Sequence, residues 1–241
     1  IFMPNSVLNQ LFNSTHYQEI LPNTLSNIIS AGEQVVVGDL FKKYILEHNI
    51  HLHNHYGPAE THVVTAHKIL PTKNLPQMPH IGFPVQNTQI HVLSEGKHIQ
   101  PVGIAGEIYI GGAQVGLGYL NRPELNEERF IPNPYGAGKL YRTGDLANWN
   151  NDGSLTFLGR KDFQVKLNGV RIELGEIEYH LNDISGISDS TVLLKEVSGN
   201  KILVGYYLAT EEILEEKLTT YLSGHLPLNM VPNHYVHMQD F

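Results

Sequence analysis

The hydrophobic periodicity of this chain changes twice along its 241 residues, and these changes limit the folds that it can adopt. From Ile1 to about Leu70, short apolar stretches alternate with helical patterns, which is typical of a β/α layer. From about Ile81 to Leu158, the apolar period is two and the stretches are separated by Gly, Pro and Asn, which predicts a small β-barrel. After Arg160, two strand pairs alternate with two helical stretches, which predicts a small α+β unit.

We therefore expect two parts. The larger part spans residues 1–161, with an α/β layer over residues 1–75 and a barrel-like region over residues 76–161. The smaller α+β part spans residues 162–241. Turn signals support this order, because "NNDGS" predicts a hairpin inside the barrel-like region and "FQVKLNGVRIEL" predicts another in the small part.

Composition excludes several classes of function. A formal net charge of -8 argues against a nucleic-acid-binding surface, which needs clustered Lys and Arg. The absence of cysteine excludes disulfides, thiolate metal sites and a cysteine nucleophile. Apolar runs fall far short of the roughly 20 residues that span a bilayer. We expect a cytoplasmic enzyme that binds neither nucleic acid nor membrane.

Several segments combine Gly with charged residues, and each alone indicates no more than a tight turn. The stretch "NHYGPAETHVVT", which begins at Asn54, places an aromatic residue, a Gly-Pro turn and a carboxylate close together. Three longer segments have the same character: "GEIYIGGAQVGLGYLNRPELNEERF" from Gly106, "YRTGDLANWNNDGSLTFLGRKD" from Tyr141 and "QVKLNGVRIELGEIE" from Gln164. Their order along the chain is more specific than any one of them.

Together with "SAGEQ" from Ser30 and "LPLNMVP" from Leu226, these segments resemble the adenylation domains of non-ribosomal peptide synthetases, members of the adenylate-forming enzyme superfamily. The resemblance covers essentially the whole chain. It implies the adenylate-forming, luciferase-like fold: an α/β layer, a β-barrel and a small mobile α+β subdomain. It also implies activation of an amino acid by ATP and Mg²⁺ to an aminoacyl-adenylate, with release of pyrophosphate. The acyl group then passes to the phosphopantetheine thiol of a carrier domain, beside a condensation domain of the same synthetase.

Some motifs of the family have no counterpart in this sequence. These are the phosphate loop, the Phe-Asp segment that holds the substrate's α-amino group and the segment with the catalytic lysine. We therefore expect an N-terminally truncated fragment that is inactive alone.

The resemblance assigns Glu60 as the carboxylate that holds Mg²⁺, a hard cation that suits oxygen ligands. Relatives often carry Thr or Ser where this chain has Ala59, so a hydroxyl contact to phosphate is lost there. The neighbouring Thr61 is a candidate to replace it.

Adenine is expected to stack on Tyr56, while Asn54 and the backbone of Gly32 and Glu33 hydrogen-bond its edge. Gly57 turns the chain so that these groups face one nucleotide.

Asp145 resembles the carboxylate that accepts both ribose hydroxyls, although the pattern alone favours an ordinary turn residue. Arg160 is expected to reach the ribose or phosphate side, and Asp162 resembles the hinge of the mobile subdomain. The side of the hairpin that faces the pantetheine tunnel in the family would carry Lys166, Gly169 and Arg171. For these last residues, an ordinary exposed hairpin is an equally good interpretation.

The family's pocket-lining positions correspond here to Phe2, Ile29, Ala31, His55, Val63 and Val64. That wall is mostly aliphatic, so we expect a neutral, apolar amino acid such as leucine. His55 leaves open a polar or keto substrate.

The segment "IHLHNHYG" suggests another possibility, because His51, His53 and His55 share one face of a strand, as zinc ligands do. A hydrogen-bonded row of neutral histidines is the preferred interpretation.

Two alternative functions stay open. One is an acyl-CoA or fatty-acyl ligase, which shares the nucleotide motifs. The other is a non-catalytic remnant that binds nucleotide or a carrier domain.

Overall fold

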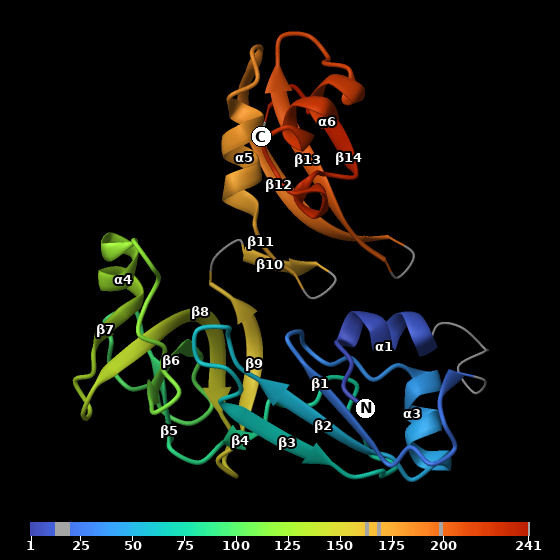
Figure 1. The fold of residues 1–241 in the computed structure, drawn as a ribbon, viewed down its shortest axis with the longest axis vertical. Helices are drawn as coiled ribbons and strands as arrows, with labels where there is room; N and C mark the ends of the chain where they lie inside the picture. Colours follow the sequence, from blue (N-terminus) through green and yellow to red (C-terminus); the bar gives the residue numbers. More distant parts are fainter. Residues whose placement is uncertain (13–19, 162–163, 168–169, 198–199, 241) are drawn as a thin grey trace. The chain divides into compact units, whose positions relative to one another are not determined.

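The computed structural model describes residues 1–12, 20–161, 164–167, 170–197 and 200–240 (Figure 1). Its contacts divide the chain into two compact units, Ile1–Lys161 and Asp162–Phe241. Each unit is described by itself. In the described part of the chain, no helix has both the length and the apolar character that a membrane span needs.

The first unit begins with a mixed sheet in the order β1-β2-β3-β4, beside which the helices lie (Figure 1). β1 and β2 are parallel, whereas β3 is antiparallel to both β2 and β4. Phe2 forms a parallel bridge with Ile29, so the start of the chain pairs along β1. The elements are α1 (Asn5–Phe12), β1 (Asn27–Ala31), α3 (Asp39–Glu47), β2 (His51–Tyr56), β3 (Thr65–Ile69) and β4 (Phe83–Pro84).

Residues of this sheet alternate between two faces, as the strand period of two requires. On one face, Ile28 and Leu52 are fully buried against the two helices. The helices contribute Leu8 from α1 and Phe41 from α3, which lie on their apolar stripes. The opposite face carries partly buried side chains, and it includes Ile29.

The remainder of the first unit is an antiparallel sheet in the order β5-β6-β8-β7, with β9 paired to β8. Register shifts in β6–β8 and β8–β9 are of the kind that bends and twists a sheet. The buried side chains of this sheet include Ile108, Ile110 and Leu155. The elements are β5 (Thr88–Leu93), β6 (Gly106–Gly112), α4 (Pro123–Arg129), β7 (Phe130–Pro132), β8 (Lys139–Trp149) and β9 (Leu155–Arg160).

The segment "NNDGS" forms the turn between β8 and β9. Gly153 donates its N–H to the Asn150 carbonyl at 3.0 Å and adopts a φ of 82°. Asp152 accepts the Ser154 N–H at 2.9 Å through Oδ1. A positive φ and an Asp that binds the backbone two residues on are what turn chemistry predicts here.

The second unit combines a hairpin with a three-stranded sheet in the order β12-β13-β14. Its core includes Ile177 from α5 and Leu218 from α6, packed with Leu203 from the sheet. β14 pairs in parallel with β13 and was not among the expected strands. The elements are β10 (Gln164–Leu167), β11 (Val170–Glu173), α5 (Leu174–Asn182), β12 (Ile187–Val197), β13 (Asn200–Ala209), α6 (Glu215–Ser223), η1 (Leu228–Met230) and β14 (His234–Met238).

Candidate nucleotide site

The loop that follows β2 is closed tightly on itself. The Val64 N–H donates to the Tyr56 carbonyl at 2.8 Å, so the chain returns beside the point where it left the strand. Gly57 makes this possible, because a Cβ there would lie 1.7 Å from the His62 carbonyl oxygen. His62 itself adopts a φ of 57°. The Gly-Pro stretch is therefore a compact turn that holds Glu60 in a defined place.

Glu60 is held at both its backbone and its side chain. Its carbonyl accepts the Gly116 N–H at 2.9 Å. Its Oε1 accepts a hydrogen bond from the Tyr119 hydroxyl at 2.6 Å, and that hydroxyl lies 3.3 Å from the Tyr141 hydroxyl. Burial, together with the hydrogen bond to Glu60, raises the pKa of Tyr119. The phenol is thus protonated and available as a donor at neutral pH.

Asp145 lies opposite Arg160 in the β8–β9 pair, and both side chains are largely buried. Arg160 Nη1 donates to Asp145 Oδ1 at 2.6 Å, while Nη2 donates to the Thr143 carbonyl at 3.1 Å. The other carboxylate oxygen, Oδ2, accepts the Tyr56 hydroxyl at 2.6 Å. Burial and the nearby Asp145 charge raise the pKa of Tyr56.

These bonds join three predicted site residues, Tyr56, Asp145 and Arg160, in one network. A carboxylate accepts only, at about four positions, so Asp145 is a hub for donors from different parts of the chain. The ring of Tyr56 also packs on Phe157, with centroids 6.1 Å apart. Nucleotide contacts by these residues stay predictions.

The predicted adenine-edge residues lie at the carboxyl end of the parallel strand pair. β1 and β2 align Ser30 with Asn54, so Gly32 and Glu33 follow β1 at the edge where β2 ends. In open α/β sheets, ligands bind outside the carboxyl ends of the strands. Gly32 has a φ of 91°, a conformation that favours glycine.

Two of these side chains already have partners. Glu33 Oε2 accepts the N–H of Ser6 at 2.8 Å, in the first turn of α1, where a carboxylate is stabilised by the helix dipole. Asn54 is buried and donates through Nδ2 to the His80 carbonyl at 3.0 Å. Its side chain is therefore held in a fixed orientation.

Thr61 is also buried. Its hydroxyl lies 3.3 Å from the His62 carbonyl oxygen, inside the same loop, as a donor to that oxygen. Its predicted contact with a phosphate would require the hydroxyl to leave this bond.

The predicted substrate-pocket residues divide into two groups. Ile29 and Ala31 lie on the partly buried face of the first sheet, and Ala31 aligns with His55 in the adjacent strand. Phe2 bridges to Ile29 and is well exposed. Val63 is partly buried in the loop. Val64 differs, because it is fully buried among the apolar side chains of the antiparallel sheet and offers no surface to a ligand.

The histidine row does share one face of β2. His53 Nε2 lies 2.9 Å from Asn27 Oδ1, and the His53 and His55 rings are 6.3 Å apart. Burial lowers the pKa of both rings, and for His53 the neighbouring His55, Lys68 and His51 contribute as well. Among the described residues, no group of three His, Asp or Glu side chains is arranged to hold a metal ion. For His53, the hydrogen bond to Asn27 and the lowered pKa fit the preferred interpretation of a neutral ring.

In the second unit, Asp162 and Gly169 lie outside the described residues. Lys166 and Arg171 occupy opposite positions of the β10–β11 hairpin. The predicted hinge and pantetheine-side roles stay predictions.

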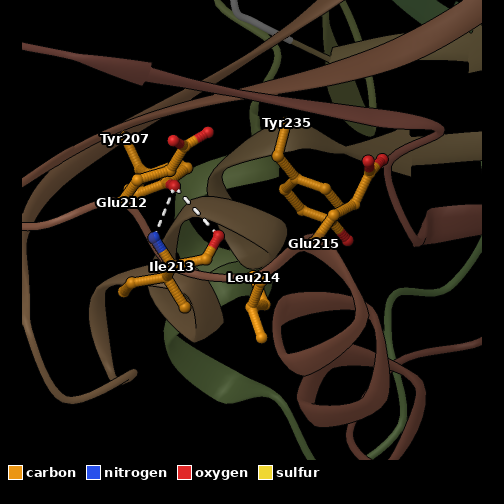
Figure 2. Close-up of a pocket in the computed structure, with 6 residues that line it drawn as sticks. All are labelled: Tyr207, Glu212, Ile213, Leu214, Glu215 and Tyr235. Carbon is orange, nitrogen blue, oxygen red and sulfur yellow. Dashed lines mark hydrogen bonds between the residues drawn. The ribbon is translucent and has the colours of Figure 1, made fainter.

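A cavity of about 270 Å³ lies elsewhere in this unit, between β13, β14 and the segment before α6 (Figure 2). The Tyr207 hydroxyl accepts the Ile213 N–H at 3.0 Å and donates to the Ile213 carbonyl at 3.2 Å, which fixes one wall. None of the predicted site residues that the structure describes lines this cavity.

Sequence reasoning missed Tyr119 and Asn126. Both belong to the Gly-rich segment that begins at Gly106, but their residue types indicate no chemistry by themselves. The signal that finds them is the contact with Glu60, which lies 59 positions from Tyr119 in the chain.

Comparison with known proteins agrees with the motifs. The family model described as "AMP-binding enzyme" matches residues 1–120. Gramicidin S synthase 2 of Brevibacillus brevis is 46% identical over 235 residues, which cover 97% of this chain and 5% of that protein. Tyrocidine synthase 2 of Brevibacillus parabrevis is 46% identical over 239 residues, which cover 98% of this chain and 7% of that protein.

Solved structures of similar fold include a protein with an adenylation domain. The solved structure of PA1221, an NRPS protein containing adenylation and PCP domains, superposes with a TM-score of 0.82 at 28% identity. The match covers 99% of this chain and 48% of that one. The chain thus spans a small part of the curated relatives and about half of this structure.

Proposed function

The chain belongs to the AMP-binding, adenylate-forming enzymes, as a relative of the adenylation domains of non-ribosomal peptide synthetases, and on this premise we propose that it takes part in amino-acid activation by ATP. The reaction joins the amino-acid carboxylate to the α-phosphate and releases pyrophosphate. The observation that carries the proposal is the network of Tyr56, Asp145 and Arg160 beside the Glu60 loop. An aromatic ring, a carboxylate and a guanidinium thus lie in one region, which supports the proposal.

Attack of a carboxylate on a phosphate brings two anions together, so the site must supply orientation and positive charge. Glu60 fits a Mg²⁺ ligand, because its carboxylate is a hard oxygen donor whose orientation is set by Tyr119 and by the closed loop. When bound, Mg²⁺ supplies positive charge beside the phosphate oxygens.

The other residues orient the nucleotide. Asp145 accepts the ribose hydroxyls, since an ionised carboxylate is an acceptor only. Arg160, held between Asp145 and the Thr143 carbonyl, fixes the position of that carboxylate. The partly buried ring of Tyr56 stacks on adenine, and Asn54 borders its edge.

The amino acid is neutral and apolar, with leucine as the leading candidate. Phe2, Ile29 and Ala31 supply an apolar wall on one sheet face, and His55 borders them. Because burial lowers the pKa of His55, its ring adds no positive charge to this wall at neutral pH. Such a wall discriminates a methylene by only about 1–3 kcal/mol, so close neighbours of leucine are accepted too.

Transfer of the acyl group to a phosphopantetheine thiol on a carrier domain completes the proposed cycle. It would take place next to a condensation domain, in the cytoplasm. The carrier is supported by PA1221, a structural relative that contains adenylation and PCP domains. Asp162 would serve as the hinge, and the β10–β11 hairpin with Lys166 and Arg171 would face the pantetheine.

The test is amino-acid-dependent ATP–pyrophosphate exchange with a panel of common amino acids. Since the phosphate-loop and terminal-lysine motifs have no counterpart in these residues, the assay uses a longer protein that carries both. The 241-residue chain, assayed in parallel, is expected to be inactive. Exchange with leucine or a close neighbour supports the proposal. Exchange with fatty or keto acids alone would instead assign the chain to the acyl ligases. The absence of exchange with every acid tested would contradict the proposed activation reaction.

A further inference from the structure

We propose that Tyr119 is a positioning residue for Glu60, and that Asn126 holds Tyr119 in place for that task. This inference rests on the proposed function, because it concerns how the Mg²⁺-binding carboxylate is oriented. Neither residue carries a recognisable motif role in the sequence.

The contact between Tyr119 and Glu60 is short and directed. The phenol oxygen lies 2.6 Å from Glu60 Oε1, in a partly buried environment. A hydrogen bond to an ionised acceptor is shorter and about twice as strong as one between neutral groups. A carboxylate accepts only, so Tyr119 must be the donor. Its proton fixes which oxygen of Glu60 faces Tyr119.

The donor direction can be followed one step further. A phenol has a single proton, and Tyr119 gives it to Glu60. In its contact with the Tyr141 hydroxyl at 3.3 Å, Tyr119 is therefore the acceptor and Tyr141 the donor. Tyr141 is fully buried in β8, so the chain of hydrogen bonds from Tyr141 to Glu60 begins at a rigid strand. Tyr119 thereby fixes the side chain of Glu60 relative to β8.

Asn126 clamps the backbone of Tyr119 from the adjacent helix α4. Its Oδ1 accepts the Tyr119 N–H at 2.6 Å, and its Nδ2 donates to the Tyr119 carbonyl at 2.8 Å. Both polar groups of one peptide residue are thus bound by one side chain. Gly118 permits this approach, because a Cβ there would lie 2.7 Å from Asn126 Oδ1.

The ring of Tyr119 is also confined. Phe130 packs on it edge to face, with centroids 5.4 Å apart and an interplanar angle of 73°. Backbone clamp, ring contact and hydroxyl bond together leave the phenol little freedom. Partners of this kind behind a metal ligand are worth about 10- to 100-fold in metal affinity when removed.

The experiment measures ATP binding by isothermal titration calorimetry, once with EDTA and once with excess Mg²⁺, in the longer protein that carries the phosphate-loop and terminal-lysine motifs. The Kd in EDTA divided by the Kd in Mg²⁺ reports how much Mg²⁺ strengthens ATP binding, without reference to turnover. Tyr119→Phe should reduce this ratio about 10-fold or more and leave the Kd in EDTA unchanged. Asn126→Ala should act in the same direction but less strongly, because the phenol is retained.

Tyr135→Phe is the matched control, since it removes a tyrosine hydroxyl that donates to the Lys97 carbonyl at 2.7 Å, away from Glu60. It should leave the ratio unchanged. A second comparison guards against a general folding defect: Tyr119→Phe is repeated in a Glu60→Gln background. If Tyr119 acts through Glu60, its effect on the ratio largely disappears there.

The outcomes separate the two proposals. A wild-type chain whose ATP binding shows no Mg²⁺ dependence would overturn the proposed function, and this inference with it. A Mg²⁺-dependent wild type with an unaltered Tyr119→Phe variant would overturn the positioning role alone. An equal effect of Tyr119→Phe with and without Glu60 would also overturn it, by indicating a structural defect.

Discussion

Arg160 and Asp145 form an ion pair of 2.6 Å across the β8–β9 pair, with most of both side chains removed from water. The pair is extended by Tyr56, which donates to the second carboxylate oxygen from a different sheet. Two sheets of the first unit are thus joined through one carboxylate. The residues proposed to bind the nucleotide therefore also contribute to the stability of this unit.

Replacing Arg160 should destabilise the first unit. Removal of one partner of a buried pair leaves the other charge uncompensated, at a cost of about 3 kcal/mol. Urea unfolding of Arg160→Ala, followed by tryptophan fluorescence of Trp149 on β8, measures the loss. Lys161→Ala is the control, because its pair with Glu95 is exposed. Equal small effects of both substitutions would show that the buried pair contributes no more than a surface one.

Gly57→Ala should disrupt the loop that carries Glu60. Its Cβ would lie 1.7 Å from the His62 carbonyl oxygen, and such overpacking of backbone costs about 3 kcal/mol or more. Gly175→Ala is the matched control, since no atom lies within 4 Å of its added Cβ and alanine favours the helix α5. Thermal unfolding of both variants tests this, and a Gly57→Ala variant with unchanged stability and ATP affinity contradicts the loop geometry.

Acid should destabilise the first unit before its carboxylates titrate. The His67 and His80 rings stack at 3.7 Å, and burial lowers the pKa of both. The unfolded chain therefore binds more protons just below the ordinary histidine pKa of about 6.5, so stability is full above that pH and falls as pH drops toward the depressed folded values. The Gly82 N–H donates to His80 Nδ1 at 3.1 Å, and this hydrogen bond would be lost if Nδ1 were protonated.

Thermal unfolding between pH 7 and 5 measures this slope. His67→Gln should reduce it, whereas the exposed His98→Gln should leave it as in the wild type. A melting temperature independent of pH across this window would refute the assignment.

His55→Ala should broaden amino-acid selection. It removes a partly buried ring from the sheet face that carries Ile29 and Ala31, so larger side chains such as phenylalanine gain relative to leucine. The expected change in relative kcat/KM is about 10- to 200-fold, measured by pyrophosphate exchange in the longer protein. Val64→Ala is the contrast, because it should lower stability and leave the selection unaltered. The reverse pattern would place Val64 in the pocket and His55 outside it.

Much of the fold was predictable because its signals are local. Alternation in β1 and β2 follows from the strand period, and the turn at "NNDGS" follows from Asp152 and Gly153. The α/β, β-rich and α+β characters of the successive regions were predicted correctly for the same reason. The strand β14 was missed, because five residues are too few to show a clear period and the pairing with β13 is visible only in the folded unit.

The sequence by itself determined the residue types, the turn at Gly57 and the motif order that identifies the family, because these depend on neighbours in the chain. Tertiary structure decided which of them meet. Tyr56 and Asp145 are 89 positions apart, and Tyr119 and Glu60 are 59 apart. It also buried Val64 in the core of the antiparallel sheet. Such contacts depend on how two sheets pack, and a periodicity confined to one strand carries no information about its distant neighbour.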